Sequence, residues 1–348
     1  MSITRRKFIG AAAAAGALAA SGAAVSGCGS EEETASTEVD KVVVGYWGGT
    51  CEAPIFIAKE KGYFEEEGLE AEVTLLDSDG GISSESGVAN GELDCYELTP
   101  DKFKPIEQGS PMKVIDSLHI GCIQACASKK SGITSVKDLE GKKVAAAQGN
   151  IAHIMLANQM VLEGADPTKV EWLTYKNPMM EAAIDAGEVD AMACYDPYVD
   201  IAVKNGKKRF WSWTYDEGVN EILCCFVGCS QLTFENKPNA PKKLAAAFKK
   251  ATQFLEENPE EAAQIILDGG YVQLNDDSGF TKDIMVTEIQ DYQWLSGDKD
   301  VFDKSYKYIW EAIWRAGALD DYDFKTVEEV DEWCMGDMYT QMCEYCGE

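Results

Sequence analysis

The stretch GYWGGTCEAPIFIAKEKGYFEEEGLEAEV, residues 45–73, contains most of one repeating unit of the fold. The β-branched run at residues 42–44 predicts a strand that leads into it, and residues 53–61 predict a helix. Residues 71–76 then predict a second strand. Between the first strand and the helix, the Gly48-Gly49 pair permits a close approach of the backbone to a ligand. The stretch therefore indicates a strand–helix–strand unit with an open loop after its first strand.

The same alternation continues along the chain. Residues 112–115 and 143–147 predict further strands, and residues 83–90 and 151–163 predict helices. This order is typical of an α/β protein. After residue 241 the sequence becomes mostly helical, and we expect this tail to pack on a lobe built by the earlier residues.

A short pattern occurs twice in the chain. VANGELDC at residues 88–95 returns as IDAGEVDA at residues 184–191. Each copy predicts a helix end, a glycine suited to a left-handed cap and the start of a strand. The repetition indicates either two lobes of similar topology or ordinary punctuation between a helix and a strand.

Composition excludes several classes of protein. The chain has 348 residues, of which 45% are hydrophobic and 26% charged, and this length allows two or three domains. The 60 acidic residues outnumber the 31 basic ones and are spread along the chain, so we expect no binding to nucleic acid. After residue 27 no apolar run is long enough for a membrane-spanning helix.

The N-terminus has the features of an export signal. Arg5 and Arg6 belong to a twin-arginine pattern, a small apolar stretch follows, and the run VSGC ends at Cys28 as in a lipobox. We expect residues 1–27 to be a signal peptide, Cys28 to carry a lipid and residues 28–40 to be a flexible tether. The mature protein would then be anchored on the outer face of the cell membrane. A short Ala-rich helix, or a plain signal peptide with an incidental Cys, is the alternative.

The opening stretch and four later segments share their order with a known family. The segments are GVANGELD from residue 87, GITSVKDLEGKKVA from residue 132, ADPTKVEWL from residue 165 and AGEVDAMACYDPY from residue 186. Together they resemble substrate-binding proteins of ABC importers, in the group that binds nitrate, sulfonates, taurine and thiamine pyrimidines.

The resemblance implies a periplasmic-binding-protein-like fold with two α/β lobes, a central cleft, two crossing segments and a helical C-terminal region. We place the crossings near residues 121–128 and 222–230. Lobe 1 is then expected at residues 41–122 and 228–348, and lobe 2 at residues 123–227. In such a fold the lobes close around the ligand.

The resemblance also implies a function. The protein is expected to be a monomeric receptor, without a cofactor or catalytic activity, that captures a small organic or anionic solute and delivers it to the permease and ATPase subunits of an importer. Two alternatives remain open at this point. The first is a lipoprotein that binds a soft metal or a thiol compound through cleft cysteines, and the second is an enzyme, of the pyrimidine-precursor type or a thiol oxidoreductase using Cys343 and Cys346.

The candidate ligand residues lie in loops that follow strands and in the two crossings. They are Trp47, Gly49, Thr50, Cys51, Glu52, Glu97, Thr99, Cys122, Gly149, Asn150, Ile151, Tyr195, Asp196 and Cys224. Several have structural alternatives: Asn150 could only cap a helix, Thr99 could start one, and Asp196 could join the lobes instead of taking a ligand ammonium. Since acidic and aromatic residues dominate this set, we expect an amine-bearing or heteroaromatic solute, with Trp47 as a stacking face.

Twelve cysteines are many for this family. Cys51, Cys122 and the adjacent Cys224-Cys225 pair fall on elements that converge at the cleft, where they could bind a soft metal, react with a thiol compound, form a disulfide or be small buried apolar residues. Adjacent residues of a strand point to opposite faces, so at most one of the pair should meet the ligand. His119 and His153 are expected to be packed or capping residues, and no metal site is expected.

Overall fold

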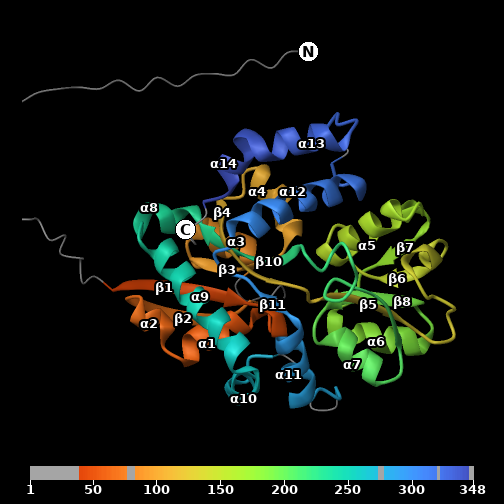
Figure 1. Ribbon diagram of the computed structural model, residues 1–348, viewed down its shortest axis with the longest axis horizontal. Helices are drawn as coiled ribbons and strands as arrows, with labels where there is room; N and C mark the ends of the chain where they lie inside the picture. The colour runs from red at the N-terminus through yellow and green to blue at the C-terminus, as the bar shows by residue number, and fades with distance from the viewer. Residues whose placement is uncertain (1–38, 77–82, 273–277, 320–321, 345–348) are drawn as a thin grey trace, which may run out of the picture. The chain divides into compact units, whose positions relative to one another are not determined.

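The first of two sheets in the computed structural model is built mainly from the N-terminal part of the chain (Figure 1). The structure describes residues 39–76, 83–272, 278–319 and 322–344. The sheet has the strand order β11-β4-β10-β3-β1-β2. Its strands are β1 (Asp40–Tyr46), β2 (Leu69–Leu75), β3 (Cys95–Leu98), β4 (Met112–Ile120), β10 (Leu223–Ser230) and β11 (Gln293–Trp294).

The second sheet uses only the middle of the chain and has the order β7-β6-β8-β5-β9. Its strands are β5 (Ile123–Ala127), β6 (Lys143–Ala145), β7 (Glu171–Leu173), β8 (Ala191–Tyr195) and β9 (Lys208–Ser212). In each sheet three neighbouring strands run parallel, namely β2-β1-β3 and β7-β6-β8, and the next strand is antiparallel. The two sheets therefore share one topology, with β11 as an addition to the first.

Helices cover both sheets. Those of the first lobe are η1 (Thr50–Glu52), α1 (Ala53–Glu60), α2 (Tyr63–Glu66), α3 (Ser84–Asn90), η2 (Pro100–Lys102) and α4 (Phe103–Glu107). Those of the second are η3 (Val136–Leu139), α5 (Ile151–Leu162), η4 (Pro167–Lys169), α6 (Asn177–Ala186) and α7 (Tyr198–Lys204). The strands and helices predicted in the opening stretch are confirmed, since β1, α1 and β2 occupy it.

The C-terminal region is helical, as predicted. It consists of α8 (Gln231–Asn236), α9 (Ala240–Glu257), α10 (Pro259–Gly269), α11 (Lys282–Asp291), α12 (Lys299–Arg315), α13 (Val327–Trp333), η5 (Cys334–Met338) and α14 (Tyr339–Met342). Helix α9 packs on α1 and α2 and buries Leu244, Phe248 and Leu255. The ring of Phe248 lies edge-on to that of Phe64 on α2, at 5.7 Å between centroids. Helix α12 packs on β10, where the ring of Phe302 lies edge-on to that of Phe226 at 5.5 Å between centroids.

Two connections join the sheets. Gly121 and Cys122 alone link β4 to β5, and residues 213–222 link β9 to β10. The first lies within the expected crossing at residues 121–128, and the second ends where the expected crossing at residues 222–230 begins. The other residues of both expected crossings pair into sheets, as β5 beside β8 and as β10 between β3 and β4. The limits of the lobes themselves remain a prediction.

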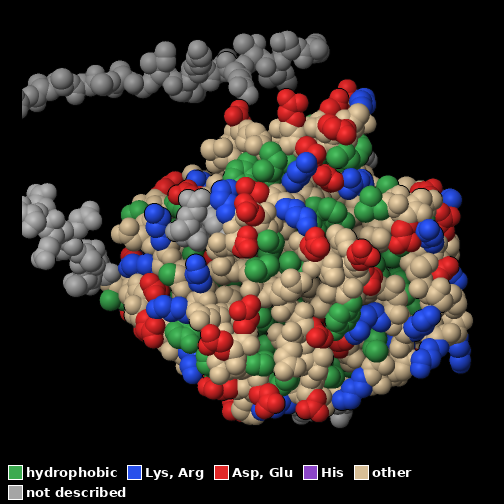
Figure 2. Space-filling view, in the orientation of Figure 1, with side chains coloured by type: hydrophobic (Ala, Val, Ile, Leu, Met, Phe, Trp, Pro, Cys, Tyr) green, Lys and Arg blue, Asp and Glu red, His purple; other side chains and the backbone are tan. Residues whose placement is uncertain are grey.

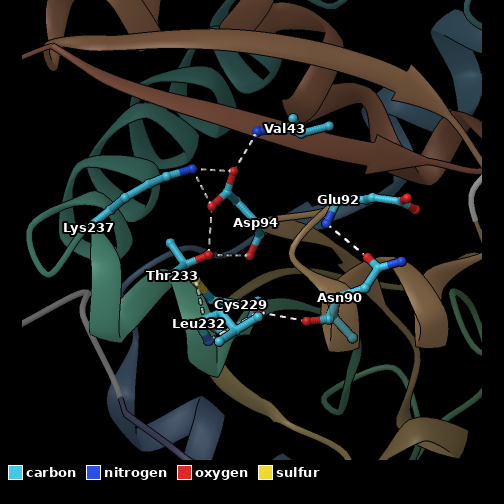
Figure 3. Close-up of polar contacts among 10 residues, drawn as sticks. Val43, Asn90, Glu92, Asp94, Cys229, Leu232, Thr233 and Lys237 are labelled. Atoms are coloured by element: carbon cyan, nitrogen blue, oxygen red, sulfur yellow. Dashed lines mark hydrogen bonds and ion pairs between the residues drawn. The ribbon is translucent and has the colours of Figure 1, made fainter.

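The repeated sequence pattern makes the same contacts in both lobes, and Figure 3 shows the first copy, around Asp94. Asp94 donates its backbone N–H to Val43 O (2.9 Å) and accepts the Val43 N–H on its carboxylate (2.8 Å). Asp190 makes the same two contacts with Lys143, at 2.8 and 3.0 Å. Each Asp follows a helix whose C-cap glycine has a positive φ, 81° and 74°. The pattern thus fixes the strand after the helix against the neighbouring parallel strand in each lobe.

Charged side chains of both signs cover the visible face of the molecule, and the acidic ones are spread over it (Figure 2). Among residues 39–344, within the described ranges, no helix has the length and apolar character to cross a membrane. Arg5, Arg6, Cys28 and Cys346 lie outside the described residues.

Candidate functional site

A cavity of about 230 Å³ lies between the elements of the two sheets. From the first lobe it is lined by the loop after β1 and by β3 with η2, and from the second by β8 and the N-termini of α5 and α6. Nine of the predicted residues line it: Trp47, Cys51, Glu52, Glu97, Thr99, Cys122, Asn150, Ile151 and Tyr195. The structure thus brings together residues up to about 150 positions apart in sequence, as expected when strand ends share an edge.

Seven lining residues were not predicted, namely Tyr96, Asp101, Lys102, Ile123, Ala152, Asn177 and Cys194. Four of them are adjacent in sequence to a predicted residue, namely Tyr96, Ile123, Ala152 and Cys194. Extending the predicted segments by one residue would have included these four. Asn177 is different because it begins α6, a helix that the sequence analysis did not single out.

Five predicted residues do not line the cavity: Gly49, Thr50, Gly149, Asp196 and Cys224. Gly49 nevertheless shapes it, because a Cβ added there would lie 3.1 Å from the Tyr195 ring. Thr50 is fully buried within η1, and Gly149 donates its N–H to His153 Nδ1 at 3.1 Å. These positions support the cavity wall.

The loop after β1 is held by one carboxylate. Glu52 is fully buried and accepts N–H groups from Trp47 (2.7 Å), Gly48 (2.7 Å) and Gly49 (2.9 Å). Burial, with the Cys51 thiol beside it, raises the pKa of Glu52 to about 8, against the lowering effect of the three N–H groups. Glu52 therefore fixes the loop that presents Trp47 to the cavity.

Three carboxyl groups line the cavity, those of Glu52, Glu97 and Asp101. Burial raises the pKa of the Glu97 carboxyl well above its usual range. Lys102 is the one Lys or Arg among the described residues that line the cavity, and its Nζ pairs with Glu85 at 2.6 Å and Asp101 at 3.8 Å. Because this cation is already paired, the cavity is poorly suited to a bare anion.

The N-terminus of α5 is capped from within the chain. Asn150 accepts the His153 N–H on its side-chain oxygen at 2.9 Å, which is the capping alternative raised from the sequence. His153 is buried, packs its ring edge-on against Trp172 and has a pKa lowered to about 4 by burial. It is a packed residue, as predicted.

Asp196 joins distant parts of the chain. Its carboxylate accepts Gln124 Nε2 at 2.6 Å and the Tyr292 hydroxyl at 2.7 Å, and it is 1% exposed. The carboxyl oxygens of Asp196, Asp200 and Glu288 lie within 4.8 Å of one another. Burial raises the pKa of both Asp196 and Glu288 well above its usual range. These contacts support the alternative in which Asp196 joins the lobes, and not the one in which it binds a ligand ammonium.

All ten cysteines in the described part of the chain are buried, and none has a disulfide partner among the described residues. Cys122 Sγ lies 3.0 Å from Cys224 Sγ and 3.7 Å from Cys225 Sγ. The expectation that the adjacent pair points to opposite faces is wrong, because β10 is irregular at Cys225 and both thiols reach the same partner. Neither of the two lines the cavity.

His119 lies among these thiols, a position that was not predicted from the sequence. Its ring stacks on Tyr292 at 4.8 Å between centroids, and one of its nitrogens lies within 4.8 Å of the sulfurs of Cys51, Cys122 and Cys225. These four residues are the group that could hold a soft metal. No signal in the sequence foretold the contact, since it depends on how β4 pairs with β10.

Comparisons with known proteins agree with this architecture. The model of a family described as NMT1/THI5 like matches residues 50–262. A Bacillus subtilis (strain 168) protein named for aliphatic sulfonate binding is 26% identical over 232 residues, which are 62% of this chain and 66% of that protein. A Haemophilus influenzae protein named for thiamine biosynthesis is 24% identical over 231 residues, which are 64% of this chain and 71% of that protein.

One solved structure shows the likeness of fold. The alkanesulfonate-binding protein SsuA from Xanthomonas axonopodis pv. citri, bound to MOPS, superposes with a TM-score of 0.64 at 17% identity. The superposition covers 81% of this chain and 95% of that one. The predicted fold, two α/β lobes with a helical C-terminal region, is confirmed.

Proposed function

The chain belongs to the NMT1/THI5-like family, and on that premise we propose that it is the solute-binding receptor of an ABC importer. The observation that carries the proposal is the cavity itself, which takes its lining from both lobes. A ligand held there contacts both lobes only when they are closed, so it stabilises the closed form. The closed form is what the permease and ATPase subunits would recognise.

The solute proposed is a small organic molecule with a heteroaromatic ring or an amino group. Trp47, Tyr96 and Tyr195 supply aromatic surface, and Glu97 supplies a buried carboxyl group whose Oε1 has no hydrogen-bond partner in the described residues. An amino group placed against Glu97 would satisfy that oxygen. The relative named for aliphatic sulfonates makes an organic sulfonate the second choice.

The proposal includes no catalysis and no cofactor, although one relative is named for thiamine biosynthesis. It also includes export, a lipid on Cys28 that holds a monomer at the outer face of the membrane, and residues 28–40 as the tether. The relative named for aliphatic sulfonate binding and the solved alkanesulfonate-binding protein support the receptor role over the enzyme. A bound solute that is recovered unchanged after release would distinguish the two.

Titration calorimetry with the purified protein tests the proposal. The probes are an aminopyrimidine, an aliphatic sulfonate and nitrate, and we expect one of the two organic probes to bind with one site per chain. Replacing Trp47 by Ala should weaken that binding by about 1 kcal/mol, roughly fivefold, because a stacking face is lost.

Trp314→Ala is the matched control, because Trp314 is half-buried on α12 and does not line the cavity. It should leave the affinity unchanged. Equal losses in the two variants would show that the cavity is not where the solute binds.

A further inference from the structure

Four side chains with metal-binding atoms meet behind the cavity. Cys51 comes from η1, His119 from β4, Cys122 from the first connection and Cys225 from β10. Their three sulfurs and one ring nitrogen all lie within 4.8 Å of one another, and the four residues are at most 4% exposed. The four donors come from three separate stretches of the chain, since His119 and Cys122 are only three residues apart, and no single sequence motif accounts for the cluster.

The spacing suits a tetrahedral ion. Zinc bound at about 2.3 Å from each thiolate separates the two sulfurs by about 3.8 Å. Cys122 Sγ and Cys225 Sγ are 3.7 Å apart. Three cysteines and one histidine are also one of the standard donor sets of structural zinc sites.

His119 gives an independent reason for a ligand. Its ring is fully buried, and neither Nδ1 nor Nε2 has a hydrogen-bond partner among the described residues. The ring is fixed by Tyr292, at 4.8 Å between centroids, and by Trp294, at 5.2 Å. A buried polar nitrogen without a partner is unfavourable, and a metal ion at the cluster would satisfy one of the two.

The backbone of Cys122, one of the four clustered residues, has an unusual conformation. It has φ of 81°, and it is the one residue other than glycine with a positive φ in the described part of the chain. Its N–H donates to Thr214 Oγ1 at 3.3 Å, which ties the first connection to the second. Strained conformations of this kind persist where function requires a side chain in a fixed place.

We propose that Cys51, His119, Cys122 and Cys225 form a closed site for one zinc ion, which fixes the loop after β1 to the connection between the sheets. Cys51 and Cys122 also line the cavity, so the ion lies directly behind the cavity wall. Because the protein supplies all four donors, the ion is a structural component and is distinct from the transported solute. The site goes beyond the receptor function and does not depend on it.

Cys224 provides the competing arrangement. Its Sγ is 3.0 Å from Cys122 Sγ, so in air O2 would take two electrons and two protons from these two thiols, join them as a disulfide and remove Cys122 from the site. Cys224 is not one of the four clustered donors. It is therefore a matched control: it is adjacent to Cys225, fully buried, and contacts the same partner.

The test is zinc binding by the full chain, purified without air and under reducing conditions. Elemental analysis should give one zinc per chain for the unmodified protein and for Cys224→Ser, and Cys225→Ser and His119→Gln should lose most of it. Replacing zinc by Co²⁺ should produce the intense visible absorption of a tetrahedral thiolate site in the first two proteins only. Circular dichroism of each variant checks that the fold is retained. If Cys225→Ser does not fold, His119→Gln is compared with Cys224→Ser in its place.

Three results would overturn the proposal: no zinc in the unmodified protein after incubation with Zn²⁺, equal zinc in Cys224→Ser and Cys225→Ser, or a Cys122–Cys224 disulfide in the protein kept reduced. None of these depends on solute binding. A negative zinc result therefore does not contradict the receptor proposal. A negative result for solute binding likewise does not contradict the zinc site.

Discussion

At the scale of single residues, the buried acids beside Asp196 decide how stability depends on pH. Neither oxygen of Glu288 has a hydrogen-bond partner among the residues described, and Thr50, Asp196 and Asp200 face it. Arg209, which pairs with Asp200, is the cation beside this group. Three carboxyl groups within 4.8 Å of one another cannot all ionise at low energy.

Glu288→Gln should therefore stabilise the protein at neutral and alkaline pH. The pKa of Glu288 is raised in the folded state, so the folded protein keeps a proton that the unfolded chain releases above about pH 4.3. The free energy of unfolding then falls as pH rises from that value, by at most about 1.4 kcal/mol per pH unit for one group. The amide removes this contribution, and urea unfolding at a series of pH values should show a flatter profile.

Asp283→Asn is the control for this change. Asp283 lies on the same helix, α11, and is exposed, so the substitution removes the same formal charge without a buried carboxyl. If the two variants show the same pH profile, the account of the buried carboxyls is wrong.

At the scale of elements, the two copies of the repeated pattern allow the contacts that stabilise each lobe to be compared. Asp94 and Asp190 occupy the same place in the two copies, but their surroundings differ. Asp94 is 5% exposed and also accepts Thr233 Oγ1 at 2.7 Å and Lys237 Nζ at 2.7 Å, which ties α8 to the first sheet (Figure 3). Asp190 bonds the backbone of Lys143 near the surface.

Asp94→Ala should lower the free energy of unfolding by about 2–4 kcal/mol, since it leaves Lys237, the buried Thr233 hydroxyl and the half-buried Val43 N–H without their acceptor. Asp190→Ala should cost about 1 kcal/mol or less, because water replaces the lost contact. Urea unfolding of the two variants measures the difference. A larger loss for Asp190→Ala would contradict this view of the pattern.

At the scale of the whole molecule, the alternation of strands and helices could be predicted because each element carries its own local pattern. The opening stretch indicated the order of β1, α1 and β2, and the repeated pattern indicated the shared topology of the sheets. The ends of the predicted strands, together with the first crossing for Cys122, also identified nine of the residues that line the cavity, since parallel strands end at one edge of a sheet.

Contacts that depend on register between distant strands could not be predicted. His119 reaches Cys225 because β4 pairs with β10 across an irregularity, and no local pattern encodes that pairing. The sequence predicts no metal site because His119 and His153 are far apart in the chain and have no neighbouring metal-ligand pattern. The Asp196–Tyr292 bond joins residues 96 positions apart for the same reason.

A receptor function requires that the cavity between the lobes holds a small solute. Native mass spectrometry of the protein purified from its own cells, compared with its denatured mass, tests this most directly. We expect an additional organic mass of one molecule per chain, lost on denaturation and reduced in Trp47→Ala, beside any zinc that Cys225→Ser removes. A protein that carries no organic mass, and gains none from an extract of small metabolites, would contradict the claim.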